Sequence, residues 1–329
     1  MSRVMHGVSQ LLLAIGICSD VAFAADVVDP HTITVPESSV FDSMDISRNY
    51  LSDKIVDYSK RMDQFFGDKR YLEDHNNSII MLETSTTMEA GGNVASAFNG
   101  IAKLDLPAAQ RRFQLVLESD PENNTAGDVT QGQPVVAKKP VATKRLAASL
   151  RFEKAEKKHW YFSSETGIIA QFPLDPFARL RGRYESPIGD WRLNVAETVF
   201  WFSTIGLGET TQIDMEHILS EPVLFRATST ATCFEEPQNC GLRQDFSILQ
   251  TLNEHTGLIY EASVLGSNKP QLEETAYVLQ LRYRYRVHRE WIFVEVNPQL
   301  NFPRTDEYKL NAVLFLKLEM IFGGYNQFM

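Results

Sequence analysis

The chain has 329 residues, of which 42 are acidic and 32 are lysine or arginine, so its formal net charge at neutral pH is −10. This acidic balance argues against a nucleic-acid-binding protein, because phosphate backbones select basic surfaces. Beyond residues 1–24 no apolar run approaches the roughly 20 residues of a membrane-spanning helix, so the chain is predicted to be either soluble or a membrane protein built from strands.

Residues 1–24 have the pattern of a secretory signal peptide. A basic start at Arg3 precedes the apolar core LLLAIGI, and the small residues of A-F-A occupy 22–24. This pattern predicts cleavage before Ala25. The apolar core is far shorter than a spanning helix, so a membrane anchor is the weaker interpretation and export is expected.

Residues 25–41 lack periodicity and are predicted to be a flexible segment. The next stretch, 42–68, is predicted to be an amphipathic helix, because apolar side chains recur at three- and four-residue steps. These side chains are Ile46, Tyr50, Leu51, Ile55, Tyr58, Met62 and Phe66. Such a helix could plug a barrel, pack beneath one or bind a partner, and packing against the rest of the protein is the favoured interpretation.

From residue 78 onward, short alternating runs follow one another, separated by turn-forming clusters. The sequence predicts about 14 strands, with about 12 as the alternative count. The expected strands are 78–90, 95–106, 111–119, 145–154, 159–172, 177–185, 191–204, 209–218, 223–232, 241–252, 257–265, 275–287, 291–300 and 309–322. Many are about ten residues long, which is the length of a tilted strand that crosses a bilayer.

The predicted connections alternate in length. Every second one is tight, as in PAAQ, SPIGD and HRE, whereas the others include the long polar stretch 120–144 and the loop between the two later cysteines. Transmembrane barrels have short turns on one side and longer loops on the other. Two of the expected long loops, AGGN and PLDP, are short, so the asymmetry is imperfect.

Alternation is strictest in 277–288. One face carries Tyr277, Leu279, Leu281, Tyr283, Tyr285 and Val287, and the other carries Val278, Gln280, Arg282, Arg284, Arg286 and His288. A soluble protein would bury the first face, but so many apolar faces would need a second layer that the sequence does not supply. Closure into one ring removes this problem together with the exposed strand edges. The predicted fold is all-β: a transmembrane, antiparallel, up-and-down β-barrel over 78–329.

With this pattern the chain resembles the outer-membrane β-barrel proteins of Gram-negative bacteria as a class, over 78–329 and the leader. Proteins of this class end in an amphipathic strand with a final aromatic residue, which the barrel-assembly machinery recognises. In NAVLFLKLEMIFGGYNQFM, Phe322 fits that role, although seven residues follow it. The resemblance therefore implies two partners, outer-membrane lipid and the assembly machinery, and a location in the outer membrane.

The inward faces of such a barrel would carry both signs of charge. The candidate lumen residues are Arg151, Arg179, Arg181, Arg183, Arg282, Arg284, Arg286, Glu153, Glu165 and Glu295. One interpretation is an arginine ladder that attracts a small anionic solute through a pore. The favoured one is a lumen cross-linked by arginine–carboxylate pairs, with Glu295 paired to Arg282 or Arg284 across the HRE turn.

Cys233 and Cys240 are the only cysteines after the leader. Their closeness in an exported chain predicts a disulfide, with two free thiols as the alternative. A zinc site is not expected, because no histidine or further cysteine lies nearby. We expect no cofactor and no metal.

The function expected from the sequence is an integral outer-membrane barrel, structural or channel-like and porin-like, that is not an enzyme. One alternative is an outer-membrane hydrolase resembling a phospholipase or protease, but no histidine forms an H-x-S pattern with a nucleophile. The other alternative is a soluble periplasmic β-rich binding protein. The sequence names no solute.

Overall fold

The computed structural model describes residues 58–67, 78–106, 113–121, 145–156, 159–235, 238–269, 271–288 and 291–323. All of them belong to one compact unit, Asp45–Met329. The predicted signal peptide, the segment 25–41 and the first part of the predicted helix lie outside the described residues, so those predictions remain untested.

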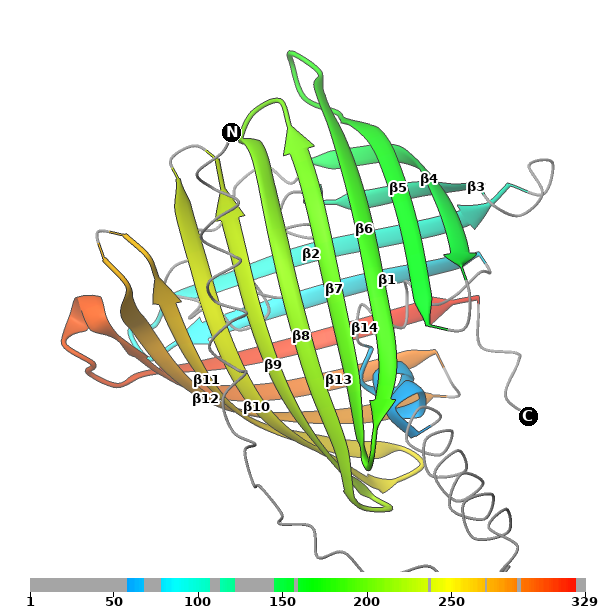
Figure 1. Cartoon of the computed structure of the whole chain (residues 1–329). Coiled ribbons are helices and arrows are strands. Elements are labelled where there is room, and N and C mark those ends of the chain that lie inside the picture. Colours follow the sequence, from blue (N-terminus) through cyan, green and yellow to red (C-terminus); the bar gives the residue numbers. More distant parts are fainter. Residues whose placement is uncertain are drawn as a thin grey trace, which may run out of the picture. The chain divides into compact units, whose positions relative to one another are not determined.

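The described chain forms an α-helix at 58–66 and then a closed ring of antiparallel strands in which each strand pairs with its sequence neighbours and β1 pairs with β14 (Figure 1). A short 3-10 helix, Arg304–Asp306, lies between the last two strands. The strands are β1 (Ile79–Glu89), β2 (Val94–Asp105), β3 (Phe113–Ser119), β4 (Leu146–Glu156), β5 (Trp160–Ile169), β6 (Asp175–Ile188), β7 (Trp191–Phe202), β8 (Gly206–Ser220), β9 (Val223–Phe234), β10 (Asn239–Asn253), β11 (Thr256–Ser267), β12 (Glu273–His288), β13 (Ile292–Pro303) and β14 (Asn311–Phe322).

The ring confirms the predicted fold class and the predicted strands. Each predicted segment overlaps one observed strand, and the higher of the two predicted counts is the right one. The largest differences are in β6 and β8, which are each longer than predicted at both ends. Strand β8 has 15 residues because the ladders with β7 and β9 extend pairing to both of its ends. Among the described residues, no helix is long and apolar enough to cross a membrane.

The two faces of the ring have opposite chemistry. Outward leucines and isoleucines are exposed, for example Leu180 at 57% and Ile168 at 48%, whereas the inward neighbours Arg183 and Glu165 are each only 6% exposed. A soluble barrel would show the reverse distribution, because apolar side chains normally line the interior.

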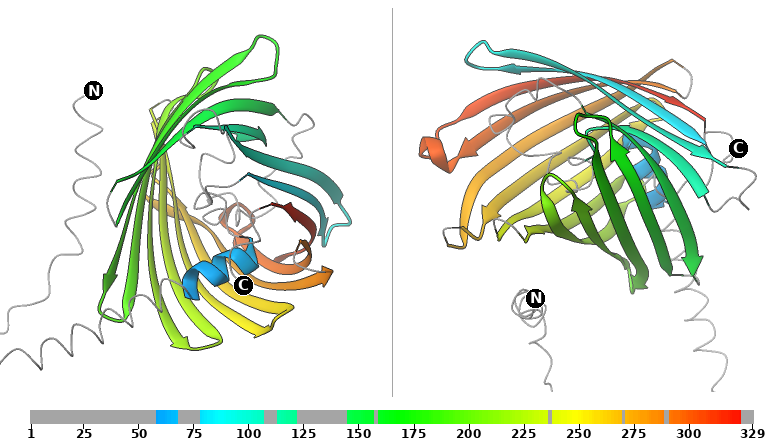
Figure 2. Two further views of the ribbon diagram at one scale, coloured as in Figure 1. Left: turned by 90° about the vertical axis from the view of Figure 1, so that its right-hand side faces the viewer. Right: turned by 90° about the horizontal axis from the view of Figure 1, so that it is seen from above.

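The described residues form four apolar clusters inside the ring, and the two larger ones lie toward opposite ends of it. At the end with short turns, Met62, Phe65 and Phe66 of the helix pack on Leu224, Leu249 and Ile259 of β9–β11. Figure 2 shows the helix within this end of the ring. Toward the loop end, Phe177, Phe200 and Phe202 form the second cluster with Ala147 and Ile169.

The helix therefore packs inside the barrel, in agreement with the favoured interpretation. Its amphipathic character over the whole of 42–68 remains a prediction, because only 58–66 is described as helix.

Candidate functional site

Between the two larger apolar clusters the inner wall is lined by ion pairs, which fall into four groups around the ring. The first group joins β2 to β6. Arg151 contacts Glu165 at 2.8 Å, and Arg179 contacts the same carboxylate at 2.6 Å and also binds Glu118. Lys103 closes the group with a 3.0 Å contact to Glu153. One carboxylate, Glu165, thus connects two arginines from different strands.

The second group runs from β6 to the helix. Arg192 lies 3.2 Å from Glu185 and 3.1 Å from Glu216, and Arg226 lies 2.7 Å from the other oxygen of Glu216. Arg226 also binds Asp63 of the helix. The helix is therefore held by an ion pair as well as by its phenylalanines.

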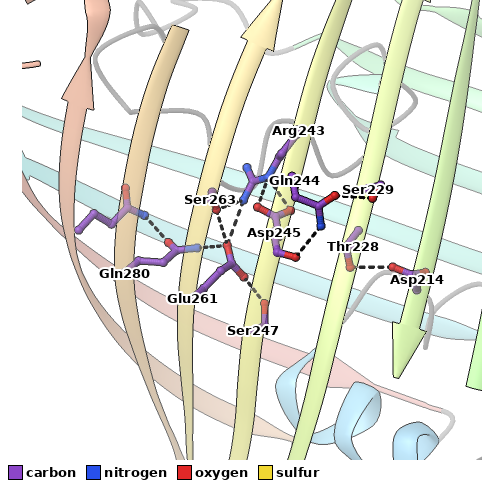
Figure 3. Close-up of polar contacts among 11 residues, drawn as sticks. Asp214, Thr228, Ser229, Arg243, Gln244, Asp245, Ser247, Glu261, Ser263 and Gln280 are labelled. Atoms are coloured by element: carbon purple, nitrogen blue, oxygen red, sulfur yellow. Dashed lines mark hydrogen bonds and ion pairs between the residues drawn. The ribbon is translucent and has the colours of Figure 1, made fainter. Parts of the chain in front are cut away.

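The third group lies on β10–β12 and is drawn in Figure 3. Arg243 contacts Asp245 at 2.6 Å and Glu261 at 3.0 Å. Glu261 also accepts hydrogen bonds from Ser247 at 3.0 Å and from the Gln280 amide at 2.5 Å. Each oxygen of this inward carboxylate has a protein donor, so the group forms a rigid polar network.

The fourth group joins β12, β13 and β14. Arg284 is fully buried, binds Glu319 and lies 3.6 Å from Glu295, and its guanidinium stacks over Phe293 with 4.2 Å to the ring centre. Lys317 lies 3.5 Å from both carboxylates. The predicted pairing of Glu295 across the HRE turn occurs, and its partner is Arg284, its register neighbour.

The residues predicted to line the lumen all lie on inward strand positions. Glu165, Arg183, Arg284 and Glu295 are buried, and the other six are half-buried. Arg282 and Arg286 differ from the rest, because neither forms an ion pair with any described residue. Arg286 instead lies near Phe65 of the helix, with 5.5 Å between its guanidinium and the ring centre. Their role in solute passage remains a prediction.

The sequence did not single out Arg192, Arg226 and Arg243, which are central to two of the four groups. Each is the only arginine within its strand, so no repeated R-x-R signal marks it. In β7 the signal was also masked by Phe200 and Phe202, which share the inward face with Arg192 and fill the apolar cluster at the loop end. Because every second residue of a strand lies on the same face, counting back from Phe202 in steps of two places Arg192 on the inward face.

The predicted disulfide is present. Cys233 and Cys240 are register partners on β9 and β10, and their Cα atoms are 4.0 Å apart. The bond closes the hairpin at the loop end of the barrel. No group of three or more histidine, cysteine or acidic side chains that could hold a metal ion occurs among the described residues.

The described histidine side chains lie at strand ends or turns. The ring of His217 hydrogen-bonds the Asp190 carbonyl at 2.8 Å and stacks on Trp191, and His159 lies against Tyr184. None of these contacts pairs a histidine with a nucleophile.

At the loop end, Arg304 and Tyr308 from the β13–β14 connection reach the start of β12. Arg304 lies 3.1 Å from Glu273, and the Tyr308 hydroxyl donates a hydrogen bond of 2.8 Å to Glu274. This hydrogen bond raises the pKa of Tyr308. The contacts tie the loop to the barrel wall.

No protein-family model and no curated protein matches the chain. Several solved structures have a similar chain course. One is OmpT with loop L8 deleted, an outer membrane protein of Vibrio cholerae; it is 10% identical, has a TM-score of 0.45, and the match covers 75% of this chain and 98% of that one. A bacterial polysaccharide outer membrane secretin has 12% identity, a TM-score of 0.47 and coverage of 76% and 99%. The outer membrane channel DcaP of Acinetobacter baumannii has 9% identity, a TM-score of 0.43 and coverage of 74% and 96%.

Proposed function

We propose that the chain is an integral outer-membrane barrel that conducts small solutes through a constricted, ion-pair-lined interior. The observation that carries the proposal is the inverted distribution of side chains, with leucines outside and salt bridges inside. In water, an apolar band around the whole ring would exceed by far the few hundred Å² that soluble monomers expose. In a bilayer the same band lies against hydrocarbon at no cost.

Pairs of aromatic side chains at the end of the barrel with short turns support placement in a bilayer. Trp160 lies 4.7 Å from Tyr184, and Trp291 lies 5.3 Å from Phe322, between ring centres. Such rings gather where strands of membrane barrels leave the hydrocarbon. Phe322 is exposed at the end of β14, which is the position that the barrel-assembly machinery would bind.

Unsatisfied polar atoms on the inner wall support a hydrated interior. The side-chain amide of Asn301 and the Nε atoms of Arg282 and Arg286 are buried and have no hydrogen-bond partner in the described protein. Buried polar groups in stable proteins are almost always hydrogen-bonded, to water where no protein group reaches them. Water along this wall would supply those partners and a path for small solutes.

The ion pairs and the helix limit that path. Most of the candidate lumen arginines are neutralised by carboxylates, so a continuous arginine ladder is not formed. A small anionic solute would instead contact Arg286, which forms no ion pair with a described residue, whereas the charge of Arg282 is partly balanced by Glu261 and Glu295. Arg286 lies beside Phe65, so the helix covers the route to this arginine from the turn end.

Single-channel recording in a planar bilayer tests the proposal. The wild-type barrel is expected to give small, discrete conductance steps, and Phe65→Ala/Phe66→Ala, which removes the apolar contacts of the helix, is expected to raise the step size several-fold. Ile168→Ala on the outer surface is the control and should leave the steps unchanged.

If wild type and the double variant both insert as folded barrels without conducting, the channel role is wrong. The cross-linked interior would then favour a structural role for the barrel.

A further inference from the structure

The outer surface carries two carboxylates where hydrocarbon is expected. Glu197 lies at the middle of β7, on the same face as Trp201, and its register partner on β8 is Thr211. The Thr211 hydroxyl donates a hydrogen bond of 2.6 Å to Glu197 Oε2. Glu209 shares this face of β8, two residues before Thr211, and pairs with Val199. The two glutamates are therefore diagonal neighbours across the β7–β8 ladder.

Polar and small side chains continue this surface onto the next two strands. Ser229 on β9 donates a hydrogen bond of 2.5 Å to Gln244 Oε1 on β10. Ala227 and Ala231 occupy the outward positions on either side of Ser229. We call Glu197, Glu209, Thr211, Ser229 and Gln244, together with these two alanines, the outer polar patch.

In a monomer the carboxylates of the outer polar patch would face lipid without a cationic partner. Ionisable groups that face lipid are costly and in membrane proteins almost always have a partner. On the inner wall each glutamate described above contacts a cation. On the outer face, away from the strand ends, no lysine or arginine occurs among the residues whose side chains are described.

We propose that the outer polar patch is the contact surface for a second copy of this chain within the membrane. Acceptors lie on its β7–β8 side, at Glu197 and Glu209, and the amide donor Gln244 lies on its β10 side. A two-fold axis along the membrane normal places the acceptor side of one copy over the donor side of the other. The patch is thus complementary to itself.

The shape of the patch fits the same arrangement. Short side chains on β9 lie at its centre, where two convex barrels approach each other most closely, and the longer Glu197 and Gln244 lie at its margins. Small residues with interspersed hydrogen-bonding groups are the features that let transmembrane elements associate in lipid.

The oligomeric state in mild detergent and in isolated outer membranes tests this inference. Wild type is expected to have twice the protomer mass by light scattering. Glu197→Leu/Gln244→Leu, which makes the surface apolar, is expected to give a folded, heat-modifiable monomer. Thr84→Leu/Ser164→Leu makes the same kind of change on the outer faces of β1 and β5 and should remain a dimer.

Cysteine cross-linking locates the contact. Ser229→Cys should form a disulfide-linked homodimer on oxidation in outer membranes, and Ser164→Cys should not. A wild-type protein that is monomeric in detergent and in membranes, a dimer that survives the Glu197/Gln244 change, or cross-linking of Ser229→Cys to a different protein would each overturn the inference. Membrane placement is tested separately, by whether the protein needs detergent for solubility.

Discussion

At the scale of single residues, the guanidinium of Arg179 shows how the inner wall is held together. It belongs to β6 but binds Glu118 of β3 and Glu165 of β5, so one side chain couples three strands. Exposed ion pairs contribute less than about 1 kcal/mol. Buried pairs behave differently, because removal of one partner leaves a charge without compensation.

Arg179→Gln is therefore expected to lower the free energy of unfolding by about 3 kcal/mol. Arg304→Gln is the matched control, because the ion pairs of Arg304 with Glu273 and Glu274 are exposed, and the loss in this variant should stay below about 1 kcal/mol. Urea unfolding in lipid vesicles, followed by tryptophan fluorescence, measures both. Equal losses would show that the ion pairs of the first group do not stabilise the barrel.

On the inner wall the loss of a charge is expected to be harmful, whereas on the outer face the gain of a charge is. Leu281→Arg should impair insertion, because a cation that faces the middle of the bilayer costs roughly 2–4 kcal/mol. Leu281→Ile keeps the surface apolar and should insert like wild type. The folded fraction is read from heat-modifiable migration after refolding into vesicles. Insertion of Leu281→Arg at the wild-type level would contradict the assignment of the two faces.

At the scale of elements, the strands were predictable because period-two alternation survives in most of them. The position of the helix could not be predicted in the same way. A repeat of apolar residues shows that a helix packs against another surface, but it does not show which surface that is. Here the partner includes Gly257 on β11. A Cβ atom at this position would lie 2.6 Å from the rings of both Phe65 and Phe66. The absence of a side chain therefore creates the space that the helix fills.

Gly257→Leu is accordingly expected to displace the helix from the end of the barrel. Hydrogen–deuterium exchange at 58–66 should increase strongly, while exchange in the strands stays slow. Gly241→Leu is the control, because a Cβ at Gly241 meets nothing within 4 Å. Unchanged protection of 58–66 in Gly257→Leu would show that the helix is not held by this contact.

The β9–β10 hairpin provides a second test of an element. Replacing Cys233 and Cys240 with serine should leave the barrel intact but lower its free energy of unfolding by about 2 kcal/mol. The strands already pair along the whole hairpin, which is why folding itself should not depend on the bond. Thermal unfolding of wild type with and without reductant is the check, and a barrel that fails to assemble without the disulfide would contradict this expectation.

At the scale of the whole molecule, closure of the ring followed from the sequence because apolar faces on so many strands had no other layer to cover them. The individual pairs on the inner wall did not follow. Arg179 and Glu118 lie on strands that are not neighbours in the ring, and such contacts depend on barrel curvature and strand tilt, which alternation does not encode. Adjacent pairs such as Arg284 and Glu295 were predictable, because a tight turn fixes their register.

The same limit explains the outer polar patch. Glu197 and Gln244 each appear as isolated breaks in an apolar face, and only the register through β8 and β9 brings them onto one surface. Strand β8 takes part in both surfaces. Its inward face carries part of the ionic wall, and its outward face carries part of the patch.

Site-directed fluorescence quenching along β12 tests the central claim most directly. Single cysteines replace Tyr277 to Val287 in turn, each is labelled with an environment-sensitive dye, and the barrel is reconstituted in vesicles. Labels at odd-numbered positions should be quenched by a lipid-attached quencher, and labels at even-numbered positions should be quenched only by a water-soluble one. Quenching without this alternation, or with the two sets exchanged, would contradict a barrel whose apolar face meets lipid and whose charged face encloses water.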